Sequence, residues 1–358
     1  MAQRNWKRRG RVGCARGQER DQLIPAGPAS SVERSLRSRC STAPSRHRRR
    51  SIAITVLGTL LVSAALSYEL DGRRAQFSHA LLAVPIWVLG LAALCHLTSL
   101  LTRSEAWRVS VHAAGGSVSR RVLFRAAGIG SLASVLSAQL GVAARIGVLR
   151  RSAPDACPRI PALIAAEVPI LAVEAMLAAL FMFTLVGPLG LPVWVPVLVI
   201  AAMLLALCGL GRFARRHQLG LWQGLAAMRN LHGRGRLIAF VVFGVLAQIA
   251  RNLLILHAVG VDASVFDAIA VLIVTVSLSP LPIGPSVGAA ATVLILGSHG
   301  IAATAAGGVL LTVTGIVGSL CFAGWACGDL ALTSLRRSRS VAAVAAPAVE
   351  LSLLAPTS

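Results

Sequence analysis

Long apolar runs separated by arginine-rich stretches dominate the chain from residue 51 onward. A helix needs about 20 apolar residues to cross the hydrocarbon core of a bilayer. Six runs meet this requirement, at residues 51–67, 80–101, 161–186, 191–211, 237–259 and 300–327. The pattern therefore predicts an all-α, polytopic membrane helix bundle with about six full spans.

Two further apolar stretches are interrupted. Residues 122–144 contain charged and polar residues among several glycines, and residues 268–297 are cut by three prolines and Gly284 between Ser279 and Ser286. Proline lacks a backbone donor and disfavours helix in the residue before it. We predict a break there, with Ser286 at the start of a short new helix. A plain external loop between two tilted spans is the alternative.

The positions of arginine predict the orientation, because basic loops stay in the cytoplasm. The tail 1–50, the loops 102–121, 145–160 and 212–236, and the C-terminal end are all basic. The turn at 187–191 carries no charge and the loop after Val259 carries only Asp262 and Asp267, so both are expected outside. We therefore expect a bacterial inner-membrane protein whose two termini both lie in the cytoplasm. With this orientation, each interrupted stretch enters and leaves the membrane on the same side.

The predicted architecture thus adds two re-entrant or broken helical hairpins, entering from opposite faces, to the six spans. Interrupted helices at matching positions of two halves are typical of an inverted repeat with a midplane site. Irregular backbone at membrane depth needs protein or water around it, so both hairpins are expected beside an internal cavity. The domain organisation is a disordered basic tail (1–50), a transmembrane domain (51–330) and a short C-terminal tail (331–358).

Composition agrees with a membrane protein and adds a basic tail. Of the 358 residues, 56% are hydrophobic, 13% charged and 4% aromatic, and a soluble protein would be about 25% charged. The net charge is +22, of which residues 1–50 contribute +11 from 14 basic and 3 acidic residues. Such a tail attracts nucleic acid or anionic lipid. We favour the simpler explanation of a solvated topogenic tail or a start codon assigned too far upstream, and we expect no specific nucleic-acid partner.

Charged residues inside the predicted spans are the first candidates for function. Glu167 and Glu174 lie seven residues apart on one helix, and an Asp, Lys or Arg at span centre costs about 2.5–3.5 kcal/mol on insertion scales. Both should face the bundle interior, with Arg251 as the expected counter-charge. A buried ion pair that fixes packing, a polar pathway for a headgroup or proton, and snorkelling to the interface are the alternatives.

Other candidate residues are fewer. Arg145 follows the first hairpin, where it could meet a lipid phosphate or act as an ordinary cytoplasmic anchor, and Gln139 lies just before it. His96 and His257 have no partner at metal-ligand spacing, and the cysteines form no paired motif. The sequence contains no nucleophile–base pair, phosphate loop or acidic cluster. We expect no metal, no cofactor and no enzymatic activity.

Two motifs carry a resemblance to a known family. Residues 137–145 read Ser-Ala-Gln-Leu-Gly-Val-Ala-Ala-Arg, and residues 280–291 read Pro-Leu-Pro-Ile-Gly-Pro-Ser-Val-Gly-Ala-Ala-Ala. They resemble the Pro-x-Arg-x-Gly-Glu-x-x-Arg and Pro-Gly-Gly-x-Gly-x-x-Glu-Ala motifs of the lysylphosphatidylglycerol synthase transmembrane, or flippase-like, family. The resemblance covers the layout of residues 51–330 and does not extend to a soluble synthase domain.

The resemblance implies a membrane protein that binds or translocates a lipid or lipid-linked substrate with an anionic headgroup. The candidate substrate-binding residues, from the motifs and the buried charges together, are Gln139, Arg145, Glu167, Glu174, Arg251, Ser279, Gly284 and Ser286. The alternative is a non-transporting scaffold or accessory subunit for a cell-envelope glycosyltransferase or lipid enzyme. A membrane enzyme acting on a polyprenyl phosphate is disfavoured by the lack of an Asp-rich or His/Glu cluster. The expected partners are membrane lipids, such an enzyme, or further copies of the chain.

Overall fold

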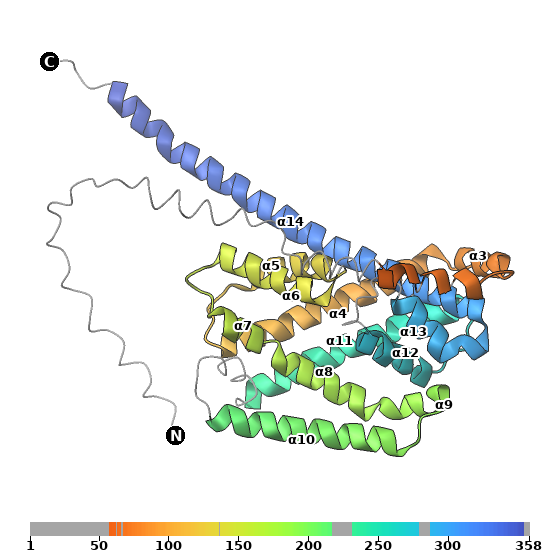
Figure 1. The fold of residues 1–358 in the computed structure, drawn as a ribbon. Helices are drawn as coiled ribbons and strands as arrows, with labels where there is room; N and C mark the ends of the chain where they lie inside the picture. The colour runs from red at the N-terminus through yellow and green to blue at the C-terminus, as the bar shows by residue number, and fades with distance from the viewer. Residues whose placement is uncertain are drawn as a thin grey trace, which may run out of the picture. The chain divides into compact units, whose positions relative to one another are not determined.

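The computed structural model describes residues 57–353 apart from residues 62, 66, 136, 217–230 and 279–286. The chain divides into the units Met1–Arg50 and Ser51–Ser358, and every described residue belongs to the second. All of the regular elements in the described part are helices (Figure 1). The helices that are long and apolar enough to cross a membrane are Ile86–Ala113, Ile160–Leu180, Arg234–Ala258 and Ile301–Leu335. These support a polytopic helical membrane protein, while the count of six spans stays a prediction.

The described residues form a series of helices. In chain order they are α3 (Arg74–Leu82), α4 (Ile86–Ala113), α5 (Arg120–Ser134), α6 (Ala138–Ser152), α7 (Ile160–Ala165), α8 (Val168–Leu180), η1 (Met182–Leu185), α9 (Val186–Leu189), α10 (Trp194–Arg216), α11 (Leu231–Ala258), α12 (Val265–Leu278), α13 (Val287–Leu296), η4 (Gly297–His299) and α14 (Ile301–Leu353). The predicted span 191–211 corresponds to α10, whose apolar part, Trp194–Gly209, is one of the shorter apolar helices. The first predicted span, 51–67, is helical at residues 57–61, 63–65 and 67, and its other residues lie outside the described part.

The first interrupted stretch forms a pair of packed helices, α5 and α6. Glycines bring the two helices together: a Cβ atom on Gly130 would lie 2.9 Å from the carbonyl oxygen of Gly141. A Cβ atom on Gly141 would lie 2.7 Å from the side chain of Ser134. Small residues at such contacts are typical of membrane helices, which gain stability from close packing. The pair, from Arg120 to Ser152, is longer than the predicted hairpin at 122–144.

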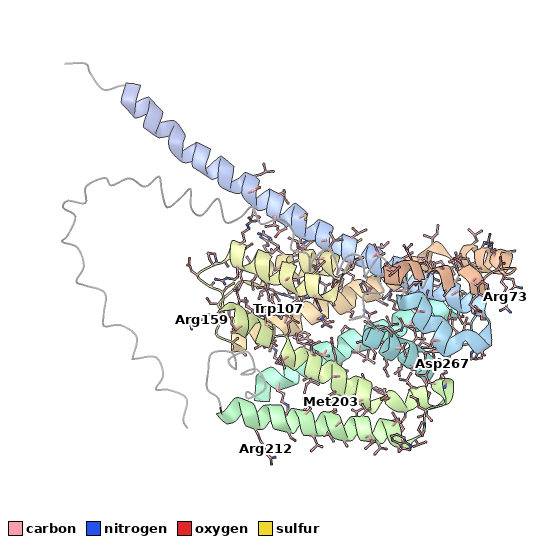
Figure 2. The ribbon with its side chains drawn as sticks, in the orientation of Figure 1. Arg73, Trp107, Arg159, Met203, Arg212 and Asp267 are labelled. Carbon is pink, nitrogen blue, oxygen red and sulfur yellow. The ribbon has the colours of Figure 1, made fainter. Side chains whose placement is uncertain are left out.

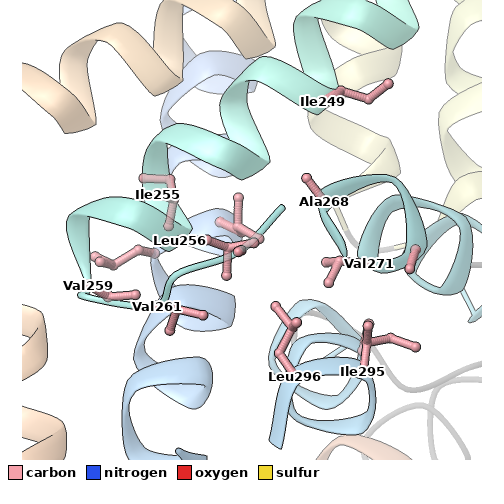
Figure 3. Close-up of a cluster of buried hydrophobic side chains, with 14 of the residues drawn as sticks. Ile249, Ile255, Leu256, Val259, Val261, Ala268, Val271, Ile295 and Leu296 are labelled. Carbon is pink, nitrogen blue, oxygen red and sulfur yellow. The ribbon is translucent and has the colours of Figure 1, made fainter. Parts of the chain in front are cut away.

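The second interrupted stretch forms α12 and α13, which also pack against each other. In Figure 3, Val271 of α12 points toward Ile295 and Leu296 of α13. Helix α12 ends at Leu278 and α13 begins at Val287. The predicted break, with Ser279, Gly284 and Ser286, lies outside the described residues.

Two large clusters of buried apolar side chains hold the bundle together. One joins the end of α11 to α12, α13 and α14, with Leu256 and Leu296 fully buried (Figure 3). The other surrounds Trp107 and joins α4, α5, α6, α7, α8 and the first half of α11. Because α8 and α11 each begin in the second cluster and run toward the first, they are parallel neighbours.

Several of the basic segments that we predicted to be loops are helical. Helix α4 continues to Ala113, and its 28 residues are about 42 Å long at 1.5 Å per residue, which exceeds the ~30 Å hydrocarbon core. We predicted a loop at residues 102–121 because they are charged, but these charges find partners in the helical bundle. Arg108 Nε lies 2.5 Å from Glu105 one turn away on the same helix. Helix α14 likewise runs through the predicted boundary at residue 330 and continues to Leu353.

The ends of the bundle agree with the predicted grouping of the loops. Arg159 and Arg212 lie at one end of the helices, whereas Asp267 lies at the other (Figure 2). Residues 145–160 and 212–236 were predicted to share the cytoplasmic side, and the loop after Val259 was predicted to lie outside. The orientation relative to a membrane stays a prediction.

Candidate functional site: two buried polar clusters

The first polar cluster is built where α6 meets the junction of α7 and α8. Helix α7 ends at Ala165 and α8 begins at Val168, with Pro169 in its first turn. Because proline has no backbone N–H to donate to the preceding turn, the helix is interrupted at this point. Glu167 lies at this interruption, and Arg145 Nη1 donates to its Oε1 atom over 2.7 Å. Only 13% of the Arg145 side chain and 9% of the Glu167 side chain are exposed. The two residues form a buried ion pair.

Trp107 of α4 completes this cluster from inside the bundle (Figure 2). The Arg145 guanidinium carbon lies 5.0 Å from the Trp107 ring centroid, within the range of a cation–π contact. Trp107 Nε1 and Arg145 Nε are both buried, and neither has a hydrogen-bond partner among the described residues. An unsatisfied buried donor costs about 1–3 kcal/mol. The cluster therefore holds two N–H groups that can still donate.

A second ion pair lies next to the first. Arg103 of α4 donates to Glu174 of α8, and Glu174 also interacts electrostatically with Glu167 and Arg145. The four side chains, which we call the charge tetrad, contain two positive and two negative groups. Arg103 is the most exposed member, at 37% of its side-chain area. The tetrad is thus neutral as a whole and reaches the protein surface at Arg103.

Arg251 forms a separate polar cluster, and the predicted pairing of Arg251 with a glutamate is wrong. Its Nε and Nη2 atoms donate to Thr314 over 3.2 Å, and Nη2 also donates to the Leu311 carbonyl. Its Nη1 atom donates to Gln248 over 3.0 Å and lies 3.2 Å from His96 Nδ1. Arg251 faces α4 and α14, whereas Glu167 and Glu174 are already paired with Arg145 and Arg103 on other helices.

The Arg251 cluster is closely fitted to its surroundings. Because both Gln248 Nε2 and Arg251 Nη1 point at His96 Nδ1, we assign His96 as the neutral tautomer with its proton on Nε2. Two glycines of α14 provide the space that the Arg251 and His96 side chains occupy. A Cβ atom on Gly315 would lie 3.2 Å from Arg251 Nη2, and one on Gly318 would lie 2.9 Å from the His96 ring. No carboxylate pairs with Arg251 among the residues that the structure describes.

A third buried ion pair lies away from both clusters. Arg125 of α5 donates to Asp329 of α14 and also reaches Thr333 over 2.8 Å. Arg121 lies 3.7 Å from the same carboxylate. This contact joins α5 to α14. It is a buried arginine–carboxylate pair outside the tetrad, with which the pairs of the tetrad can be compared.

An apolar groove lies between α8, α10 and α11, on a different face of α8 from the glutamates. Its volume is about 240 Å³, and nine of its ten lining residues are apolar. Pro169, Val173 and Leu177 line it from α8, and Leu237 and Val242 line it from α11. Arg234 of α11 is its single charged lining residue.

The remaining candidates are placed as follows. Gln139 is exposed at the start of α6 and takes no part in the contacts of either cluster. Ser279, Gly284 and Ser286 lie outside the described residues. The sequence did not point to Arg103, Trp107, Thr314 or Arg234, and His96 was weighed only as a metal ligand. Arg103 and Trp107 were missed because they were assigned to a loop; a helical reading of α4 would have placed Arg103 at membrane depth.

Within the described residues, no group of three or more His, Cys, Asp or Glu side chains is arranged to hold a metal ion. No protein-family model matches the chain, and neither a curated protein nor a solved structure matches it significantly. The resemblance to the flippase-like family therefore stays a prediction.

Proposed function

We propose that this protein binds and translocates a membrane lipid or lipid-linked molecule with an anionic headgroup in the inner membrane of a bacterium. In this proposal the chain has six spans and two re-entrant hairpins, with both termini in the cytoplasm. The headgroup enters at the charge tetrad. The proposal involves no chemical step.

The observation that carries the proposal is the pair of buried donors at Trp107 Nε1 and Arg145 Nε. Buried polar groups are nearly always hydrogen-bonded, so two unpaired buried donors in one cluster point to a ligand that would accept from them. A phosphate offers several acceptor oxygens, and its hydrogen bonds to an arginine are strong because they are charge-assisted. Arginine presents its donors as a fork, so Arg145 can hold Glu167 and a phosphate together.

The surroundings support a headgroup rather than a free anion in water. Three members of the tetrad, Arg103, Glu167 and Glu174, lie in the candidate spans Ile86–Ala113 and Ile160–Leu180. Arg103 is partly exposed, so an incoming headgroup has a charged contact before it reaches the buried pair. Arg251 of α11 adds a further positive charge inside the bundle, where it contacts the candidate spans α4 and α14.

A non-transporting scaffold is the second candidate. It is favoured by the saturation of Arg251, all of whose donors are used by groups on α4, α11 and α14. Polar groups used in this way fix helix packing and leave nothing for a substrate. In this case the partner is an envelope glycosyltransferase or lipid enzyme.

The test is lipid exchange in proteoliposomes that contain a fluorescent phosphatidylglycerol, with an impermeant reductant to quench the outer leaflet. We expect the wild-type protein to accelerate exchange over empty vesicles. Arg145→Gln should lower the initial rate about tenfold, which corresponds to about 1.4 kcal/mol. Trp107→Phe keeps the aromatic ring but removes the N–H donor, and should lower the rate less.

Arg125→Gln is the matched control, because it also breaks a buried arginine–carboxylate pair but lies outside the tetrad. Its exchange rate should equal that of the wild type at a temperature where both are folded. Wild-type exchange no faster than that of empty vesicles would contradict the proposal and favour the scaffold. An equal loss in Arg125→Gln and Arg145→Gln would show that folding, and not a headgroup contact, is being measured.

A further inference from the structure

The groove between α8, α10 and α11 runs along the helices, in the direction that the acyl chains of a bilayer take. Arg234 and Val242 lie eight residues apart on α11, and Pro169 and Leu177 lie eight residues apart on α8. At 1.5 Å per residue each wall is about 12 Å long. Because α8 and α11 are parallel and both belong to candidate spans, the groove runs along the expected membrane normal.

The volume of the groove limits how much of a lipid it can hold. At about 240 Å³, it is below the roughly 300–1,000 Å³ of sites that enclose a drug-sized ligand. Its lining is apolar apart from Arg234. The groove therefore suits one hydrocarbon chain and not a whole lipid.

The charge at its end identifies the class of lipid. Arg234 lies in the first turn of α11, the end of the helix that we expect at the level of the headgroups. It is exposed and makes no hydrogen bond or ion pair to another residue that the structure describes. We infer that the groove holds one acyl chain of an anionic phospholipid whose phosphate contacts Arg234, while its second chain stays in the bilayer. This is a resident-lipid site, separate from the charge tetrad.

Native mass spectrometry of the full-length protein in detergent tests the site. The probes are phosphatidylglycerol, phosphatidylcholine with the same chains, and single-chain lysophosphatidylglycerol. We expect one phosphatidylglycerol to be retained at least about tenfold more tightly than phosphatidylcholine, and lysophosphatidylglycerol to compete for it. Val242→Trp, which fills the groove, should remove this bound lipid. Arg234→Gln should reduce the retention of phosphatidylglycerol to that of phosphatidylcholine.

Two matched variants serve as controls. Leu205→Trp adds the same bulk at a position of α10 that is 73% exposed and does not line the groove, and Arg212→Gln removes an exposed arginine of α10. Both should retain the lipid. Equal retention of the two diacyl lipids by the wild type, unchanged binding in Val242→Trp or Arg234→Gln, or equal losses in the controls would overturn the inference. Retention does not depend on transfer, so the failure of this site and the failure of lipid exchange are separate results.

Discussion

Replacing Arg251 tests how a buried charge is stabilised between three helices. Its five N–H donors meet acceptors on Gln248, His96, Thr314 and Leu311, and all of these acceptors are neutral when His96 is the assigned tautomer. The cluster therefore gains hydrogen bonds but offers no counter-charge among the described residues. We expect Arg251→Met to be tolerated better than the conservative Arg251→Lys.

The expected magnitudes follow from two opposing terms. Side-chain hydrogen bonds between membrane helices average about 0.6 kcal/mol, so the loss of five costs about 3 kcal/mol. Moving an arginine to the centre of a span costs about 2.5–3.5 kcal/mol, and methionine avoids this cost. Arg251→Met should therefore change the free energy of unfolding by less than about 1 kcal/mol. Arg251→Lys keeps the charge but has only three donors, so it should lose about 1–2 kcal/mol.

The assay is thermal unfolding of the purified protein in detergent, where the unfolded state exposes the residue at position 251 to water. The expected order of Tm is wild type and Arg251→Met together, with Arg251→Lys below them. A Tm for Arg251→Met well below that of Arg251→Lys would refute the reasoning. That result would mean that the positive charge itself is stabilised, by an anion held beside Arg251.

The other predictions concern packing and orientation. Gly130→Ala places a Cβ atom 2.9 Å from the Gly141 carbonyl and should destabilise the protein by about 1–3 kcal/mol. In contrast, a Cβ atom at Gly147 of α6 meets nothing within 4 Å, so Gly147→Ala should stabilise the protein by about 0.5–1 kcal/mol. Unfolding midpoints check both substitutions, and a lower midpoint for Gly147→Ala would contradict the packing. In a variant without native cysteines, Arg151→Cys should react with an impermeant thiol reagent only in inverted vesicles and Asp262→Cys only in intact cells. The reverse pattern at either position would invalidate the orientation.

The sequence predicted most helices because hydrophobic run length is a local property. Runs at 80–101, 161–186, 237–259 and 300–327 each contain most of a candidate span. Helix ends were predicted less well, since charged residues were taken as loop residues. In α4 the charges at Glu105 and Arg108 lie one helical turn apart and satisfy each other, so charge alone did not mark the end of the helix.

The ion pairs could not be predicted in the same way. Glu167 and Glu174 were expected to find internal partners, and both do. The choice of partner depends on which helix face is nearest in the folded bundle, and the chain offers 35 basic residues against 13 acidic ones. Arg251 was selected because it lies deep in a span, but depth does not fix the face on which a side chain lies.

The two buried arginines differ in what a headgroup can gain from them. Arg145 has a paired charge and a spare donor, so a phosphate can bind without breaking any existing contact. Arg251 has no carboxylate partner in the described part of the chain, but each of its donors is occupied, and a phosphate must displace a contact with α4, α11 or α14. Binding should therefore begin at Arg145. Contact with Arg251 requires its hydrogen bonds to Leu311 and Thr314 of α14 to open, which makes separation of α14 from α11 the step that would admit a headgroup to the centre of the bundle.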